Sequence, residues 1–231
     1  MSGCAKNLDD GSAWNTSVSG NTPAFVEFPL RPKWDWGPAA TDIRHLASLN
    51  GSYELPFGPH RKFLSHASRP VSAVASGWTT SAIVNVQTGF PFTPQLGYNP
   101  TGNGDTRNPV RPNWNPDFKG SLYPRSPNQY FNPAAFLPPA TGTYGNVSRD
   151  SLTGPGLTEV DFSATKAVHL TERVGLQFRA EFFNMLNHTN FSTPNEVVYT
   201  SATSGISPTA GVVTATSTTS RQIQFGAKLQ F

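Results

Sequence analysis

The sequence is poor in charge, in cysteine and in long apolar runs. Only 13% of its 231 residues are charged, against about a quarter in ordinary soluble domains. Its single cysteine, Cys4, excludes an internal disulfide and a cysteine-based zinc site. No apolar run reaches the roughly 18 residues of a transmembrane helix, so we expect none. This composition is a poor match to a soluble enzyme.

Motifs that carry chemistry are also missing. The net charge is only +3 without a dense Lys/Arg run, so we expect no nucleic-acid partner. The five histidines are scattered, and none has a second ligand at metal-binding spacing. No Gly-x-Ser-x-Gly motif occurs, and Gly102-Asn-Gly104 lacks the Gly-Lys-Ser/Thr of a phosphate loop. We therefore expect no enzyme, no cofactor and no metal.

Phenylalanine, glycine and proline are abundant instead. The chain has 16 Phe, 20 Gly and 21 Pro but only two Met. Aromatic residues combined with small polar ones favour β-strands joined by long loops.

Residues 221–231 carry the clearest pattern. Every second side chain is apolar, and Gln, Gly or Lys fill the positions between, so an extended strand here has one apolar and one polar face. The length matches the roughly 9–11 residues of a tilted membrane-spanning strand. The segment is typical of the closing strand of an outer-membrane β-barrel, with lipid on one side and a polar lumen on the other.

Other segments repeat this alternation: 157–168, 174–187, 77–88 (except Ile83) and 43–57 (except Leu46), with 24–30 as a short sixth candidate. A helical stripe is the alternative for 174–187, but the unbroken alternation from Val174 to Phe182 favours a strand. We predict an all-β fold. It is an antiparallel up-and-down meander, a partial transmembrane β-barrel of about five or six strands with long loops.

The connections alternate in length. Residues 58–76 and 169–173 are shorter than 89–156 and 188–220. Outer-membrane barrels have short periplasmic turns and longer extracellular loops, so we expect a periplasmic C-terminus and two extracellular long loops. We divide the chain into an irregular segment 1–41 that enters the barrel and barrel strands within 42–231, with long loops at 93–156 and 188–220.

Two groups of side chains are functional candidates. On adjacent strands, Glu159, Asp161, Arg179 and Glu181 are expected to face the lumen, where they stabilise the wall or contact a substrate. The long loop offers aromatic and guanidinium groups that suit a sugar or an anionic ligand. The alternative is that this loop packs on its own aromatics. The candidate ligand-contacting residues are Trp114, Tyr123, Tyr130, Arg107 and Arg111.

Short stretches along most of residues 33–231 resemble the C-terminal barrel of TonB-dependent receptor-like outer-membrane proteins of the Oar-like, acidobacterial type. The strongest are TER at 171–173, LQFRAEFFN at 176–184 and RQIQFG at 221–226. Others are DWGP at 35–38, DIRH at 42–45, YELPFG at 53–58, GW at 77–78, QTGFPFT at 87–93, YFNPAAF at 130–136, GTYGN at 142–146, GPG at 154–156 and DFS at 161–163. Met185 and Thr189 depart from the family pattern near one strand-to-loop junction.

The resemblance implies an outer-membrane location and a C-terminal fragment of a receptor or transporter, not functional as a transporter alone. The family's signal peptide, carboxypeptidase-regulatory-like domain, plug and remaining strands are not found in these residues. Implied partners are outer-membrane lipid, the barrel-assembly machinery, the rest of the receptor and a ligand that the sequence does not identify. In such barrels the assembly machinery reads the last strand, here through Phe225, Leu229 and Phe231.

Two other interpretations stay open at this point. One is a soluble or surface β-sandwich that binds carbohydrate through its aromatic loop. The other is a complete small barrel or self-assembling pore, which needs more strands than the pattern supplies.

The terminal aromatic residue gives a first testable prediction. Deleting Phe231 from the full-length parent protein should impair membrane assembly, because an unpaired strand edge is the template through which another protein pairs. The amount of folded barrel that shifts on heating in gel electrophoresis measures assembly. Unchanged levels would contradict the prediction.

Overall fold

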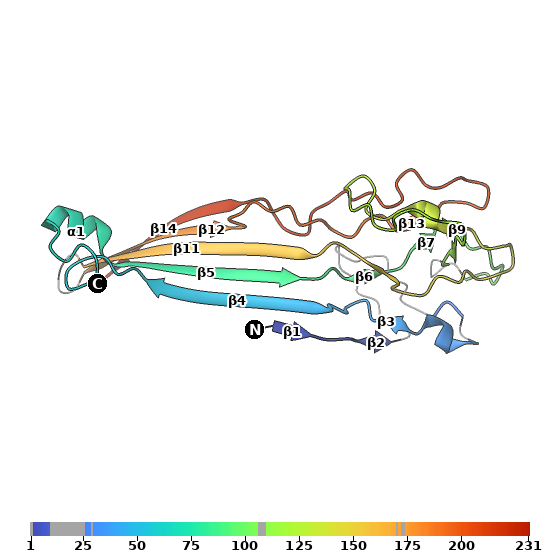
Figure 1. Ribbon diagram of the computed structural model, residues 1–231, viewed down its shortest axis with the longest axis horizontal. Helices are drawn as coiled ribbons and strands as arrows, with labels where there is room; N and C mark the ends of the chain where they lie inside the picture. The colour runs from blue at the N-terminus through green and yellow to red at the C-terminus, as the bar shows by residue number, and fades with distance from the viewer. Residues whose placement is uncertain (1, 10–25, 29, 106–109, 170, 172–173) are drawn as a thin grey trace.

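The computed structural model describes residues 2–9, 26–28, 30–105, 110–169, 171 and 174–231. The molecule is elongated, with a sheet at one end and a body rich in loops at the other (Figure 1). We call this body the head; it consists of the described residues within 5–44, 88–156 and 184–221. The C-terminus and the connection that contains α1 (Arg69–Ala75) lie at the opposite end.

The sheet has six strands in the order β1-β4-β5-β11-β12-β14, and every neighbouring pair is antiparallel. From β4 onward, neighbours in the sheet follow one another along the chain among these long strands. The all-β antiparallel meander is therefore confirmed. The strands are β1 (Ser2–Cys4), β4 (His45–Glu54), β5 (Trp78–Gln87), β11 (Leu157–His169), β12 (Gly175–Phe183) and β14 (Gln222–Gln230).

The prediction of a sixth strand at residues 24–30 was wrong. The described part of 24–30 contains no strand, while residues 24, 25 and 29 lie outside the described residues. The backbone N–H groups of Glu27 and Phe28 donate to Oδ2 of Asp35 at 3.0 and 3.3 Å, so a side chain takes the bonds that a sheet would need. The sixth strand is β1, within the segment expected to be irregular, and it pairs with β4 through Cys4 and His45.

The register aligns side chains of one kind. Residues directly opposite each other share a face, and the pairs Val160–Val84, Phe162–Phe182 and Phe182–Ile223 put apolar side chains together. We call this the apolar face; it comprises Leu49, Tyr53, Trp78, Val84, Val86, Val160, Phe162, Val168, Leu176, Phe178, Phe182, Ile223, Phe225 and Leu229.

The other side is the polar face. It comprises Ser48, Asn50, Ser52, Glu54, Ser81, Asn85, Glu159, Asp161, Ser163, Gln177, Arg179, Glu181, Gln222, Gln224 and Lys228. Leu46 and Ile83, the two exceptions in the sequence, lie opposite Gln87 and Asn50 on this face.

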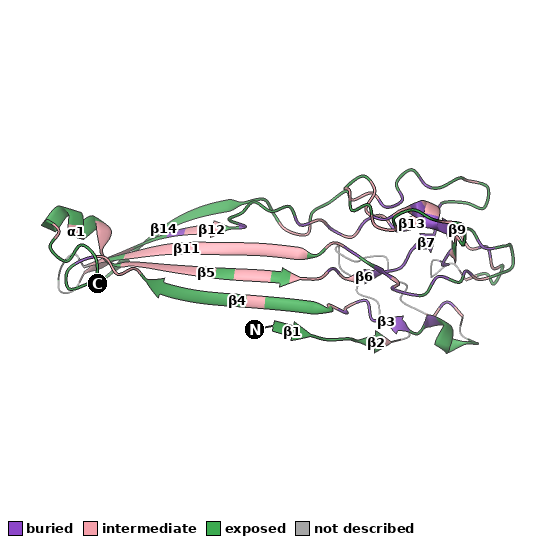
Figure 2. Cartoon of the chain, in the orientation of Figure 1, coloured by how far each residue is buried: buried purple, intermediate pink, exposed green. Residues whose placement is uncertain are grey.

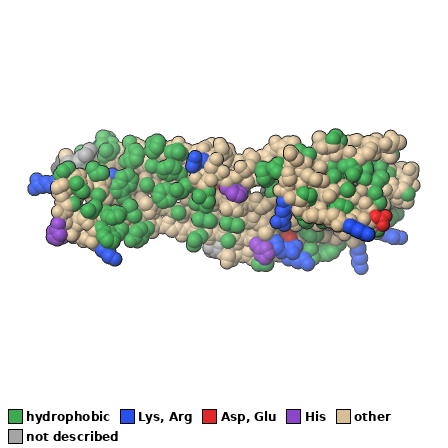
Figure 3. All heavy atoms as spheres, turned by 45° about the horizontal axis from the view of Figure 1, so that its top comes forward, with side chains coloured by type: hydrophobic (Ala, Val, Ile, Leu, Met, Phe, Trp, Pro, Cys, Tyr) green, Lys and Arg blue, Asp and Glu red, His purple; other side chains and the backbone are tan. Residues whose placement is uncertain are grey.

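The sheet is a single layer, and its burial differs from that of the head (Figure 2). Large side chains of the apolar face remain exposed, including Leu49 at 70% and Phe225 at 67%. In β14 every residue is exposed. Hydrophobic side chains accordingly cover much of the surface over the sheet (Figure 3).

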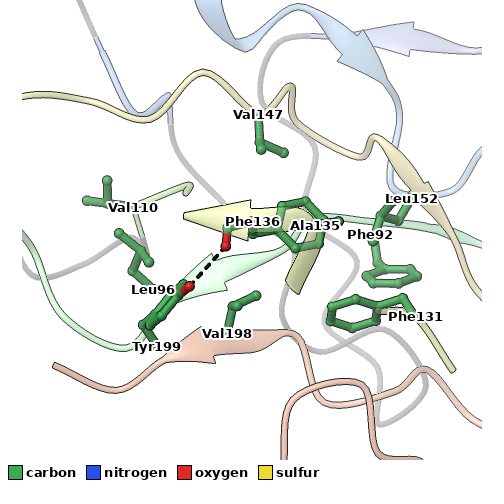
Figure 4. Packing of buried hydrophobic residues seen from close by; sticks show 10 residues of the cluster. All are labelled: Phe92, Leu96, Val110, Phe131, Ala135, Phe136, Val147, Leu152, Val198 and Tyr199. Carbon is green, nitrogen blue, oxygen red and sulfur yellow. Dashed lines mark hydrogen bonds between the residues drawn. The ribbon is translucent and has the colours of Figure 1, made fainter. Parts of the chain in front are cut away.

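The core of the molecule lies in the head, not under the sheet. Phe92, Phe131 and Phe136 are buried there (Figure 4). The ring centroid of Phe131 lies 5.6 Å from that of Phe92 and 5.9 Å from that of Phe136. The phenol of Tyr199 donates a hydrogen bond of 2.9 Å to the carbonyl oxygen of Phe136. The remaining core members are Leu96, Val110, Ala135, Val147, Leu152 and Val198.

Short elements build the head. They are η1 (Pro32–Asp35), η2 (Pro133–Ala135), β2 (Leu8–Asp9), β3 (Gly37–Pro38), β6 (Pro91–Phe92), β7 (Gln95–Leu96), β8 (Asn113–Trp114), β9 (Phe136–Leu137), β10 (Leu152–Thr153) and β13 (Val197–Tyr199). The two long loops thus pack together through β7 and β13, which pair in parallel. None of the helices among the described residues has the length and apolar character to cross a membrane.

The tight packing of the head predicts a glycine requirement. A Cβ on Gly145 would collide with the carbonyl oxygens of Arg111 and Pro112, whereas Gly205 has open space around it. Gly145→Ala should destabilise the head by about 1–3 kcal/mol, as overpacking does, and Gly205→Ala should be neutral. Thermal unfolding of the two variants checks this. Equal midpoints would contradict it.

Candidate functional site

The expected lumen-facing residues share the polar face. Within β12, Arg179 and Glu181 form an ion pair of 2.7 Å. Glu159 and Asp161 lie on β11 further toward the head, and Oδ1 of Asp161 accepts from the backbone N–H of Asn184 at 2.9 Å. The register therefore brings all four charges to one side of the sheet. Asp161 also fixes the backbone of Asn184 where β12 ends, and the Arg179–Glu181 ion pair links two side chains of β12.

The proposed assembly signal lies on an open edge. Among the described residues, β14 pairs with β12 only, and Phe225 and Leu229 stand on the apolar face. Phe225 stacks on Phe178 with centroids 6.1 Å apart. Phe231 follows β14 and is 95% exposed. The edge and all three side chains are accessible to another protein.

The candidate ligand-contacting residues of the long loop separate into different environments. Trp114 is 36% exposed and packs against Phe136 at 4.9 Å between centroids. Arg107 lies outside the described residues. Tyr123 and Tyr130 lie together, edge to face at 6.2 Å.

The interpretation of Arg111 as a ligand-contacting residue needs correction. Its side chain is fully buried, and its guanidinium bonds Oδ1 of Asp35 at 2.5 Å and Oε2 of Glu27 at 2.6 Å. Two carboxylates therefore occupy the groups that a ligand would need. The sequence places these acids far from Arg111, so spacing gave no signal for the pairing. Arg149 is a second buried guanidinium, bonded to Asp9 and Asp150.

This buried cluster ties the N-terminal segment to the head. Burial raises the pKa of Glu27 to about 7, although the Arg111 guanidinium beside it acts in the opposite direction. The neighbouring Asp35 carboxylate adds to the rise. One guanidinium neutralises one carboxylate, so the second is easier to bury with a proton.

Tyr123 and Tyr130 line a cavity of about 650 Å³ where the sheet meets the head. We call it the junction cavity. It also includes Arg125, one of the guanidinium groups of the long loop, and His188, which the sequence analysis did not single out as a site residue. Burial raises the pKa of Tyr130 to about 12 and also raises the pKa of Tyr123, while Arg125 opposes both shifts. Both phenols therefore stay protonated hydrogen-bond donors at neutral pH.

The described residues hold no group of three or more His, Cys, Asp or Glu side chains arranged for a metal ion. A family model described as "Outer membrane beta barrel domain" matches residues 4–224. No curated protein and no solved structure matches the chain.

The Glu27 carboxyl predicts a pH dependence. Its folded pKa of about 7 exceeds its ordinary value of 4.5, so the folded state holds the proton more tightly. The stabilising contribution of this carboxyl is therefore fully present below pH 4.5. It decreases as the pH rises toward 7, by at most about 1.4 kcal/mol per pH unit. Glu27→Gln should flatten this slope. The urea midpoint, followed by tryptophan fluorescence between pH 4.5 and 7, measures it.

The matched control is Glu54→Gln, which removes an exposed carboxylate paired with Arg61. It should leave the slope as in the original chain. A slope that survives Glu27→Gln would show that another group is responsible.

Proposed function

This chain belongs to the family of outer membrane beta barrel domains, and on that premise we propose that it supplies the C-terminal strands of a larger, TonB-dependent receptor barrel. The main support for this proposal is the sheet itself. Most of its apolar and polar side chains lie on opposite faces, which can serve as a lipid face and a lumen face. Lys166 is an exception on the apolar face, and its ammonium group donates to the carbonyl oxygens of Val74 and Ser76. The location is the outer membrane.

Open edges support a larger barrel. In the described part of the chain, β14 forms one edge, and the short β1 covers only the first residues of β4 at the other. Unpaired backbone groups are costly in lipid, so a membrane sheet closes on itself. Receptors of this kind have about 22 strands around a plugged lumen. In the proposal, preceding strands of the same protein pair with both edges and a plug fills the lumen.

The arrangement of connections suggests the orientation. The head contains both long loops, and the end with α1 and the C-terminus contains the shorter connections (Figure 1). Long loops are extracellular in bacterial barrels. The head is then the outer surface that meets a ligand, and the charges of the polar face border the path of that ligand. This role involves no catalysis, cofactor or nucleic acid.

The β-sandwich alternative is not favoured. A sandwich covers its apolar face with a second sheet, whereas Phe178, Phe225 and Leu229 remain exposed. Among the described residues, the other sheets have two strands each and are formed by elements of the head.

An epitope inserted between Ala202 and Thr203, both exposed in the head, tests the proposal in the native cell. The tagged gene product should fractionate with the outer membrane, shift on heating and be far larger than 24.9 kDa. The untagged strain is the control. A single tagged species of 24.9 kDa would contradict a larger receptor and favour a small barrel.

A further inference from the structure

The junction cavity begins where β5 and β11 end, and one of its lining residues continues the apolar face of the sheet. The ladder between β4 and β5 continues past their ends, because the backbone N–H of Thr88 donates to the carbonyl oxygen of His45 at 3.0 Å. Thr88 follows Gln87, which lies on the polar face, so alternation turns the Thr88 side chain to the apolar face. Leu157 is the partner of Gln87 in the β5–β11 pairing, so continuing this pairing by one residue places Gly156 opposite Thr88. Both residues line the cavity.

In the orientation proposed above, the cavity lies at the outer rim of the membrane. Thr88 and Gly156 stand directly beyond the ends of β5 and β11, where the apolar face stops and the head begins. In the space-filling view, a small hollow lies between the sheet and the head (Figure 3). This is the level at which aromatic girdles meet lipid headgroups in outer-membrane barrels.

Its charge favours an anion. Among the described residues that line it, Arg125 is the only Lys, Arg, Asp or Glu side chain, and it is exposed. The phenols of Tyr123 and Tyr130 lie close enough for this guanidinium to affect both electrostatically. One cation and two protonated phenols make a donor set for phosphate oxygens.

The remaining lining suits a sugar. Nδ1 of His188 lies 3.0 Å from Oδ1 of Asn190, whose Nδ2 already donates to Thr158 and Thr218. The proton is therefore assigned to Nδ1, and Nε2 of the neutral ring can accept from a ligand hydroxyl. Tyr130 and Phe191 also line the cavity, and aromatic rings are the kind of surface on which sugars stack.

We propose that the junction cavity binds a phosphorylated sugar, with Arg125, Tyr123 and Tyr130 holding the phosphate and His188 a hydroxyl. The headgroup of an outer-leaflet glycolipid presents this chemistry at this level of the membrane, and a soluble sugar phosphate presents it from the medium. The inference rests on membership of the outer-membrane family and on the orientation proposed above, and not on the identity of the receptor.

The test uses the full-length protein that contains this chain, purified in detergent, and native mass spectrometry with three probes: bisphosphorylated lipid A, its dephosphorylated form and glucose 1-phosphate. Bisphosphorylated lipid A should bind, and removing the phosphates should weaken binding at least about tenfold, as for one charge-assisted hydrogen bond. Glucose 1-phosphate that binds as tightly would identify a soluble source. Binding of neither phosphorylated probe, or equal binding of the dephosphorylated lipid, would overturn the proposal.

Variants assign the binding to the cavity. Arg125→Gln should weaken binding of the phosphorylated probe about tenfold, and Tyr130→Phe, which removes only a hydroxyl, about fivefold. Lys119→Gln removes an exposed cation of the head that does not line the cavity, so binding should not change. An equal loss in Lys119→Gln would overturn the assignment. Heat-modifiable mobility confirms that each variant is folded.

Discussion

Pairing register is the constraint on which the rest of the structure depends. A shift of one residue between β11 and β12 would turn Phe178 and Phe182 to the side of Glu159 and Asp161. The observed register keeps five long strands in phase, so the sheet can meet lipid with one face and water with the other. Backbone hydrogen bonds between strands satisfy the polar groups that lipid cannot. The strand ends then decide where the membrane stops and where the head begins.

The head is held differently, by packing and buried charge. Two buried guanidinium groups lie beside its phenylalanine core, and both bond carboxylates of the N-terminal segment. Arg111 bonds Glu27 and Asp35, and Arg149 bonds Asp9. A buried cation without its partner is costly, so these pairs fix how the N-terminal segment crosses the head. They also use up side chains that would otherwise suit an anion. Arg125, which lines the junction cavity, remains an accessible cation.

The sequence predicted the strands but not which residues of the head pack and pair with one another, for a physical reason. Strict alternation of apolar and polar residues fits an extended strand with one apolar face. The expected segment 174–187 accordingly appears as β12 and 221–231 as β14, each shorter at its ends than expected. The core aromatics Phe92, Phe131 and Phe136 follow no period, and pairs such as Glu27 with Arg111 join residues distant in the chain. Arg111 therefore looked like a ligand group, while Arg125 and His188 came together only through folding.

The most direct measurement compares adjacent positions on β12. In a Cys4→Ser background, Phe178→Cys and Gln177→Cys each carry one environment-sensitive dye in the full-length protein in lipid vesicles. These side chains lie on opposite faces of one strand. A quencher attached to lipid tails should reach the dye at position 178 and spare the dye at 177, while iodide should do the reverse. Equal quenching at both positions, or lipid quenching at 177 alone, would contradict the account.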